Sequence, residues 1–506
     1  MDTRRLAPRL LLAALLSVAA GCGGGGGAST GGSTPTFNAP GPSAVSLTTP
    51  SPTITVMAST SDSSFTFLLP LTAANAPAGA KIFASGISST WAIASLEFPS
   101  GGATTPQVTL AFKSPSTLGA GTYLDWVKLQ ACANGPCGGT AASQLNLMVT
   151  FVITQPPLVP VNRITLPHDV IDAKYSRALD AVVMVSANPS NALYVYNTKT
   201  NVELSQPLSK TPTAVAVGPT GHDAAVGHDG MITYVDLSAL TQANPPAPIV
   251  LGVSTSVFDL VLDGNGYVHA IPSGTQWMDL HSVNIATGAE TIATGDQVQA
   301  GSHARLQPGT RFFYTAGPSI TGSIESKWDA SSGTAAHLYD IFHPSDAACG
   351  NFWFADDGIT AYTPCGYIYQ ASPVQAQDMA QIGQIPRGKV NYADTAGNVG
   401  FSTTLVTWAD ESDAARELLA IDAQGTTCDF DLDPTQSQCL TTITAYDSVS
   451  MSQNWQRSLP NITVGSQPYL QRALFVFHSS DGATRFAVST LAGDPTPPAQ
   501  YYLTAF

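Results

Sequence analysis

The feature that most constrains the fold is a turn-and-strand unit that recurs through the C-terminal two thirds of the chain. It appears as AKYSRALDAVVMVS, GPTGHDAAVG, LDGNGYVHAI, QPGTRFFYTA, ADDGITAYTP, DTAGNVGFST and SSDGATRFAVST. Reference positions in consecutive units (Ser176, Thr220, Gly264, Gly309, Gly358, Gly397 and Gly482) are 44, 44, 45, 49, 39 and 85 residues apart. Self-similarity at this period indicates a repeat architecture in which each unit packs on its neighbours.

A second unit follows the first in most repeats: a strand, an Asp or Asn, a small turn and another strand. LYVYNTKTNVEL (193–204) and ITYVDLSAL (232–240) are examples. Together the two units supply about four short strands per 40–50 residues, which is the composition of a β-propeller blade. The sequence therefore predicts a seven-bladed β-propeller over residues 163–506.

The doubled last spacing predicts an insertion near residues 409–439, with a short helical stretch over 412–422. Closing the ring should need a clasp, because an open propeller would expose sheet edges. The apolar ends of the repeat region, RITL (163–166) and PAQYYLTAF (498–506), are expected to share one blade.

The segment 42–155 alternates apolar and polar residues in short runs such as SFTFLLPL (64–71) and LNLMVTFVIT (145–154). Period-two runs bounded by Gly, Pro, Ser and Asn predict strands. About seven strands in this length fit an immunoglobulin-like β-sandwich, and residues 118–154 resemble the end of bacterial Ig-like domains. A Pro-rich linker, 156–162, follows, so the fold class expected for the chain is all-β.

Composition supports an exported β-rich protein. Only 11% of the residues are charged, against roughly 25% in typical globular proteins. The chain is too apolar for overall disorder. With 20 basic and 35 acidic side chains it has a formal net charge of -15, which excludes a protein that binds nucleic-acid backbones.

Residues 1–22 predict a lipoprotein signal. Arg4, Arg5 and Arg9 precede an apolar stretch of about nine residues, which is too short to span a bilayer. Small residues before Cys22 resemble a bacterial lipobox, although Ala19 stands where that family has Leu. The resemblance implies acylation of Cys22. The alternative is an ordinary secretory signal cleaved near Ala20.

The segment 23–41, rich in Gly, Ser, Thr and Pro, cannot bury enough apolar surface to fold and predicts a flexible tether. Gly23 replaces the Asp that resembles an inner-membrane retention signal, so the resemblance implies the bacterial outer membrane, with the chain in the periplasm or on the cell surface. Removing residues 1–21 would take away three Arg and one Asp. The mature chain would then have 17 basic and 34 acidic side chains, a net charge of -17.

Six cysteines remain once Cys22 is taken as the lipid site, and they fall into close couples. In an oxidising compartment they predict three local disulfides: Cys132–Cys137, Cys349–Cys365 and Cys428–Cys439. A zinc site is the competing interpretation, but no Cys-x-x-Cys or nearby His completes the pattern.

Carboxylates alternate within the loop CDFDLDPTQSQC (428–439), at Asp429, Asp431 and Asp433. Calcium prefers such oxygen ligands, but the loop lacks the Gly and the final Glu of an EF-hand. A solvated acidic loop closed by a disulfide is the alternative. His222 and His228 are a second candidate pair for a metal, with packing beside turn-forming Asp residues as the competing interpretation.

The repeat region resembles the YVTN or quinoprotein amine-dehydrogenase-like propeller superfamily. The resemblance leaves two functions open. The main prediction is a membrane-anchored scaffold without catalysis or cofactor, which binds an envelope protein or a glycan. Trp277, Trp408 and Trp455 could form a carbohydrate or peptide platform, but packing between blades is the favoured interpretation of these residues. The alternative is a lactonase-like or quinoprotein dehydrogenase-like enzyme, which would need His, Asp or Glu converging at the central channel.

Motifs that would identify a reaction are missing from the sequence. There is no Gly-x-Ser-x-Gly nucleophile elbow and no phosphate-binding or dinucleotide-binding loop. Asp356 and Asp357 are adjacent acids on a turn and are expected to face water.

Overall fold

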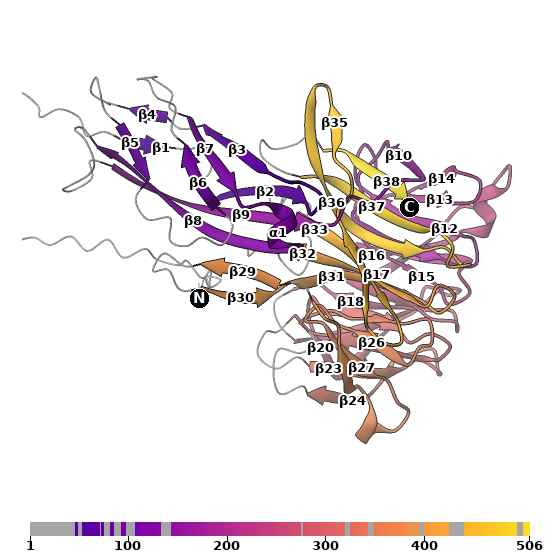
Figure 1. Cartoon of the computed structure of the whole chain (residues 1–506). Helices are drawn as coiled ribbons and strands as arrows, with labels where there is room; N and C mark the ends of the chain where they lie inside the picture. The colour runs from indigo at the N-terminus through magenta and orange to yellow at the C-terminus, as the bar shows by residue number, and fades with distance from the viewer. Residues whose placement is uncertain are drawn as a thin grey trace, which may run out of the picture. The chain divides into compact units, whose positions relative to one another are not determined.

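The computed structural model describes residues 46–48, 53–70, 72–74, 81–84, 93–97, 107–132, 143–274, 277–318, 324–342, 349–387, 389–393, 399–424, 440–492 and 499–506. These residues are almost entirely β-strand, which confirms the all-β class (Figure 1). The helices are short: α1 (Pro115–Leu118) and the 3-10 turns η1 (Ser238–Thr241) and η2 (Gln375–Gln377). No helix in the described ranges is long and apolar enough to cross a membrane.

Two sheets and a short strand pair form the N-terminal part. The larger sheet has the order β2 (Thr53–Ser59), β9 (Ser143–Thr154), β8 (Gly121–Cys132), β29 (Lys389–Ala393), β30 (Val399–Thr403), with β5 (Lys81–Ala84) also on β8. The smaller has the order β3 (Phe65–Pro70), β7 (Gln107–Phe112), β6 (Ile93–Glu97), and β1 (Ser46–Thr48) pairs β4 (Thr72–Ala74). Alternate residues of β2 are buried, and Val56, Leu110 and Phe151 belong to one apolar core shared by both sheets.

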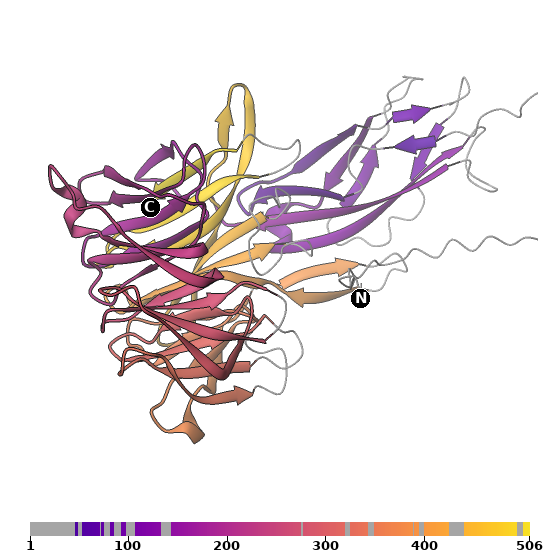
Figure 2. The same ribbon diagram turned by 180° about the vertical axis from the view of Figure 1, so that it is seen from behind.

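Successive antiparallel meanders make up most of the remaining chain, and Figure 2 shows them from behind. Their strands are β11 (Asp172–Ser176), β12 (Ala181–Ser186), β13 (Ala192–Asn197), β14 (Val202–Pro207); β15 (Pro212–Val217), β16 (Asp223–Asp236), β17 (Ile249–Leu262), β18 (Tyr267–Pro272), β19 (Trp277–Asn284), β20 (Glu290–Gln299); β21 (His303–Leu306), β22 (Phe312–Ala316), β23 (Ile324–Asp329), β24 (Ala336–Phe342); β25 (Trp353–Phe354), β26 (Thr360–Tyr362), β27 (Tyr367–Gln370), β28 (Ala380–Gln384); β31 (Leu405–Ser412), β32 (Glu417–Gln424), β33 (Leu440–Asp447), β34 (Gln453–Arg457).

Strand β17 serves two meanders. Its first part, Ile249–Ser256, pairs with β16, and its second part, from Val257 onward, pairs with β18. The strand therefore ends one repeat and begins the next without an intervening loop. This continuity joins the second and third repeats of the sequence into one six-stranded sheet.

The last sheet joins the two ends of the repeat region. It has the order β10 (Asn162–Leu166), β38 (Tyr501–Ala505), β37 (Arg485–Ala492), β36 (Gln467–His478), β35 (Ile462–Val464). Ile164 lies opposite Leu503, so the predicted sharing of one sheet by residues 163–166 and the C-terminus is confirmed (Figures 1 and 2). Meanders in series, closed by strands from both ends, form the topology of a β-propeller.

A residue with positive φ stands in the turn between the first and second strands of each repeat. These residues are Asp180, Gly221, Gly266, Gly309, Gly358, Arg416 and Gly482. Glycine adopts this conformation without steric cost, and Asp tolerates it better than most residues. This requirement explains why Gly or Asp occupies the turn in all of these repeats except the sixth, which has Arg416.

Two expectations about the sixth repeat are wrong. Residues 412–422 form a turn and strand β32 rather than a helix, and residues 409–424 of the expected insertion belong to the sheet β31–β34. Strand β32 is buried from Glu417 to Ala423, so its apolar run has no alternation to distinguish it from a helix. The unit 394–403 contributes β30, whose hairpin partner β29 pairs with β8 of the N-terminal sheet.

Several predicted features lie outside the described residues. They are the signal and tether (1–41), Cys22, Cys137, Cys428, Cys439, and the candidate calcium ligands Asp429, Asp431 and Asp433.

Candidate functional site

The first strands of the meanders surround a cavity of about 300 Å³. Strands β11, β15, β17, β21, β25, β31 and β36 all contribute side chains to it, so it lies where the repeats converge. Its notable members are aromatic or charged: Trp353, Trp408, Phe477, Lys174, Arg305, Arg177, Asp356, Asp410 and Glu411. A concave site with aromatic walls and a few convergent polar groups is the usual form of a binding site.

Aromatic rings form one side of the cavity. The ring centroids of Trp353 and Trp408 are 6.1 Å apart, and Phe477 meets Trp408 nearly edge-on at 5.9 Å. The indole N–H of Trp408 donates to the carbonyl of Val476 at 3.1 Å, which ties the ring to the neighbouring repeat. The Lys174 ammonium lies 5.2 Å from the Trp408 ring centroid, within the range of a cation–π interaction.

Each of two cations on the inner strands has its own carboxylate. Lys174 Nζ lies 2.7 Å from Asp172, and Arg305 donates to Asp259 at 2.8 Å. Burial alone would raise the pKa of Asp259, but Arg305 and His303 hold it well below its ordinary value. These two cations are therefore neutralised by partners on the inner strands.

A second charged layer lies where the inner strands end in their turns. Arg177 contacts Asp356 at 2.8 Å and Asp410 at 3.7 Å, and it donates to the backbone carbonyl of Glu411 at 2.8 Å. The backbone N–H of Asp356 donates to Glu411 Oε2 at 3.1 Å. We call Arg177, Asp356, Asp410 and Glu411 the acidic mouth, since the group contains three carboxyl groups and one guanidinium.

Two carboxyl groups of the acidic mouth, those of Glu411 and Asp356, have raised pKa values. Burial, together with the nearby charges of Asp413 and Asp356, raises the pKa of Glu411 to about 7. Burial also raises the pKa of Asp356, and Asp410 adds to this effect while Arg177 opposes it. Carboxyl groups with raised pKa values in a cavity are typical of functional sites, although structural networks can also produce them.

His478 closes the back of the acidic mouth. It is fully buried, with Nδ1 2.8 Å from Asp410 and Nε2 3.3 Å from Glu417. Glu417 is also paired with Arg485. Burial disfavours the charged ring, but the hydrogen bonds to Asp410 and Glu417 outweigh it and raise the pKa of His478. The histidine therefore holds two repeats together rather than facing the cavity.

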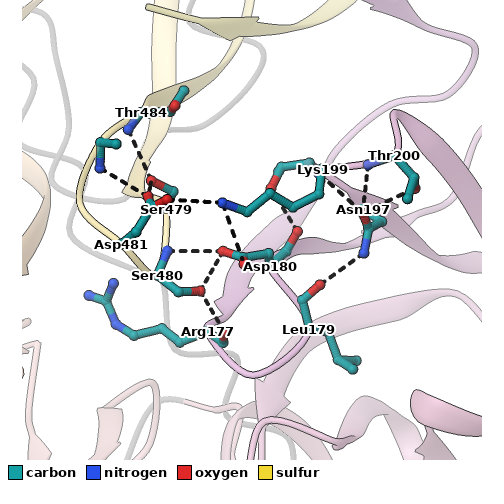
Figure 3. A network of polar contacts seen from close by, with 12 residues as sticks. Arg177, Leu179, Asp180, Asn197, Lys199, Thr200, Ser479, Ser480, Asp481 and Thr484 are labelled. Atoms are coloured by element: carbon teal, nitrogen blue, oxygen red, sulfur yellow. Dashed lines mark hydrogen bonds and ion pairs between the residues drawn. The ribbon is translucent and has the colours of Figure 1, made fainter.

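A polar network between the first and last repeats positions Arg177 (Figure 3). The hydroxyl of Ser480 lies 2.5 Å from the carbonyl of Arg177 and also contacts the carboxylate of Asp180, which accepts the Ser480 N–H at 3.0 Å. Lys199 extends the network to Asp481 at 3.1 Å. The turn that carries Arg177 is thus fastened to the turn of the last repeat through Ser480.

A serine, a histidine and an aspartate also line up elsewhere, but in a buried position. Ser282 Oγ is 2.9 Å from His269 Nδ1, and His269 Nε2 is 3.2 Å from Asp263. All three are nearly inaccessible, and Ser282 also accepts the backbone N–H of Ala335. The arrangement ties strands together and offers no open position for a substrate.

Of the sequence candidates in the described residues, Trp408 and Asp356 line the cavity and the others lie apart from it. Cys349 and Cys365 form a disulfide with their Cα atoms 5.8 Å apart. His228 contacts the carbonyl of Thr211 and the hydroxyl of Thr233, each at 3.0 Å. His222 pairs with Ser238, and no group of three or more potential metal ligands occurs among the described residues.

The three tryptophans, for which the sequence favours packing between blades over a binding platform, lie in different environments. Trp277 is exposed on β19, Trp455 is half-buried on β34, and Trp408 lines the cavity. The expectation that both adjacent acids face water is wrong for Asp356, which is half-buried beside Arg177, and right for exposed Asp357. Sequence reasoning missed Lys174, Arg177, Arg305, Asp410 and Glu411. Their only signal is a shared position at the inner strand and turn of their repeats.

No protein-family model matches the chain, and no curated protein matches it. Among solved structures, the β-propeller domain of Cps50 (Swd1) from Myceliophteria thermophila is similar over 68% of this chain and 99% of its own, with 10% identity and a TM-score of 0.44.

Proposed function

We propose that the chain is a lipid-anchored binding scaffold of the bacterial cell envelope. In this proposal the meanders form a seven-bladed propeller, which binds an envelope protein or a glycan at the cavity. The Ig-like β-sandwich of residues 42–155 separates the propeller from the membrane, to which acylated Cys22 and the tether 23–41 attach it. The calcium loop at Asp429, Asp431 and Asp433 and the disulfides Cys132–Cys137 and Cys428–Cys439 remain part of the same proposal.

The cavity at the convergence of the inner strands is the observation that carries the binding role. Trp353, Trp408 and Phe477 supply large, rigid contact surfaces that need little ordering when a ligand binds. Lys174 and Arg305 are already neutralised by Asp172 and Asp259, so they shape the walls without requiring a charged substrate. Such a site favours recognition over chemistry.

The binding role is tested by capture from solubilised envelope fractions with the mature chain immobilised. A Trp408→Ala variant, checked for its fold by circular dichroism, serves as the comparison. We expect a protein or glycan retained by the wild type and lost by the variant. Equal retention by both would exclude the cavity as the binding site.

The anchor is tested separately by a Cys22→Ser substitution. Acylation requires the thiol, so the variant should leave the membrane fraction and appear in the soluble periplasmic or secreted fraction. Unchanged membrane association of the Cys22→Ser protein would contradict the proposed lipid anchor.

Glu411 favours the enzymatic alternative as a second candidate. A carboxyl group with a pKa of about 7 beside Asp356 could exchange a proton with a substrate in the cavity, as hydrolases of the lactonase type require. A screen with lactone and ester substrates would test this role. Turnover that disappears in Glu411→Gln would favour the enzyme, and its absence at every pH between 5 and 9 would count against it.

A further inference from the structure

We propose that the acidic mouth receives a basic side chain, a lysine or an arginine, from a flexible segment of a partner protein. The inference rests on the proposed binding function and names the chemistry of its ligand. Its two elements are the excess of carboxylates at one end of the cavity and the aromatic walls next to them.

Charge pairing shows where a cation would be attracted. Lys174 and Arg305 are matched by Asp172 and Asp259, and His478 with Arg485 matches Asp410 with Glu417. Arg177 then pairs with Asp356, and it donates to the backbone carbonyl of Glu411 rather than to its carboxyl group. The Glu411 carboxyl group accepts the Asp356 N–H, and exposed Asp413 adds a further negative charge close to it. The acidic mouth is therefore incompletely neutralised, and a guanidinium or ammonium group would complete it.

The molecule already shows how a guanidinium fits there. Arg177 lies between Asp356 and Asp410, but its contact with Asp410 is long, at 3.7 Å. Its side chain remains about one third exposed, as does that of Asp356 (34% and 29%), so these two members of the acidic mouth are reachable from solvent. Glu411 is buried (4% exposed), so its charge acts on a bound cation from inside the site. A second basic group can share these carboxylates in the same manner as Arg177.

The aromatic walls suit the rest of such a side chain. Trp408 already accepts the Lys174 ammonium at 5.2 Å, which shows that its face can hold a cation. Trp353 and Phe477 each lie against Trp408, and apolar surface of this kind packs against the methylene stem of Lys or Arg. The formal net charge of -15 would also draw basic segments toward the protein.

The partner is a protein segment rather than a free small cation, because the cavity offers more than its charged end. Its lining runs from the acidic mouth past both tryptophans to Leu260 and Ala304 on other inner strands. A free guanidinium would contact only the mouth, whereas a side chain carried on a backbone can fill the remaining space. Contacts that the partner makes outside the cavity would determine the length and the sequence of the rest of the segment.

The experiment measures binding of short peptides by tryptophan fluorescence at pH 8. The probes are acetyl-Gly-Ala-Arg-Ala-Gly-amide, the same peptide with norleucine in place of Arg, and methylguanidinium alone. We expect saturable binding of the Arg peptide, roughly tenfold weaker binding to Glu411→Gln, and unchanged binding to the control Asp296→Asn. Asp296 is an exposed carboxylate on another repeat.

Binding should also strengthen between pH 6 and pH 8, because a cation favours the ionised form of Glu411. The groups around Glu411 are Arg177, Asp356, Asp410, Asp413, Tyr362 and Ser448. The pH dependence should disappear in Glu411→Gln, which retains an oxygen to accept the Asp356 N–H. Loss of the pH dependence of peptide binding in Glu411→Gln would show that Glu411 acts on the bound cation, whereas a merely structural role would leave this pH dependence in place.

Three results would overturn the proposal. Equal affinity for the Arg and norleucine peptides would remove the need for charge. Equal effects of Glu411→Gln and Asp296→Asn would move the site elsewhere. Methylguanidinium binding as tightly as the Arg peptide would make the ligand a small cation. If envelope capture still depends on Trp408 in any of these cases, the scaffold function stands and only its ligand chemistry is wrong.

Discussion

At the scale of single residues, Asp180 has the most consequential position outside the cavity (Figure 3). It has a positive φ of 45°, accepts bonds from Ser480, and receives the hydroxyl of Tyr175 at 3.0 Å. Aspartate suits this position for two reasons: it tolerates the left-handed backbone region, and its carboxylate supplies two acceptor oxygens. The side chain thus joins the first repeat to the last.

Asp180→Asn tests this junction. Asparagine tolerates the same backbone but loses the charge and one acceptor, so we expect a loss of about 1–2 kcal/mol in the free energy of unfolding. The measurement is urea denaturation followed by circular dichroism. Asp481→Asn is the matched control, because Asp481 contacts Lys199 in the same network but is exposed and should have a smaller effect. Equal losses in both variants would contradict a special role for Asp180.

Glu411 makes a pH-dependent contribution to stability. Since its pKa is raised to about 7 by burial and neighbouring carboxylates, the folded chain binds more protons than the unfolded chain between about pH 4.5 and 7. Stability contributed by the neutral form is therefore present at low pH and lost as the pH rises through 7. The loss should be on the order of 2–3 kcal/mol.

Glu411→Gln removes this dependence. Relative to the wild type, the variant should gain stability at pH 8 and show little gain at pH 4, as measured by urea denaturation at both values. A gain of the same size at both pH values would show that the titration of Glu411 is not its cause.

At the scale of elements, the turns between first and second strands explain both the repeat and the packing of neighbours. Gly358 and Gly309 share the same turn position, with φ of +66° and +70°. A Cβ at Gly358 would lie 2.4 Å from the carbonyl oxygen of Pro308, whereas one at Gly309 would meet nothing within 4 Å. Substitution of Gly309 would therefore measure the cost of the positive φ alone, whereas substitution of Gly358 would add the cost of a clash with the adjacent turn.

Gly309→Ala should cost about 1–2 kcal/mol, the ordinary cost of an L-residue at positive φ. Gly358→Ala should cost clearly more, since Ala also forces the turn away from Pro308. Thermal denaturation of the two variants under identical conditions provides the comparison. A larger loss for Gly309→Ala would invalidate the argument from close packing.

The strands and turns were predictable from the sequence to different degrees. Units ending in GNGYVHAI or GTRFFYTA combine a turn residue with a buried strand, and both signals survive in the structure. The prediction for the sixth repeat was wrong because strand β32 is buried on both faces and its turn has Arg416 rather than Gly. Local pattern cannot distinguish such a strand from a helix.

The cavity could not be predicted for a different reason. Arg177, Asp356 and Asp410 are far apart in the sequence and meet because the repeats converge. Arg177 and Asp356 stand in turns and Asp410 lies near the end of strand β31, so no local motif common to the three marks them. The identity of the site depends on the closed arrangement of all the repeats.

At the scale of the whole molecule, β38 holds the two ends of the propeller together. Leu503 is 3% exposed and lies opposite both Ile164 on β10 and Val488 on β37. Truncating a buried leucine costs about 2–5 kcal/mol, depending on how the site relaxes. Because β10 has only β38 as its partner in the sheet order, its protection depends on the C-terminal strand.

Leu503→Ala should therefore lower stability by about 2–5 kcal/mol and accelerate amide hydrogen exchange in residues 162–166. Val202→Ala, on the outer strand of the first meander, is a control expected to change stability by less than about 0.5 kcal/mol. Hydrogen exchange followed by mass spectrometry reports the protection of β10 and of β38 in the same experiment. Unchanged exchange in 162–166 would show that closure does not depend on β38.

The closing sheet also sets an order of events during synthesis. Strand β10 is made before every other strand of the repeats, whereas its partner β38 (residues 501–505) is made after all of them. During synthesis β10 therefore lacks its sheet partner until every meander between the two strands has been made. The sheet that joins the two ends of the repeat region is consequently the last one to form, however early the other meanders fold.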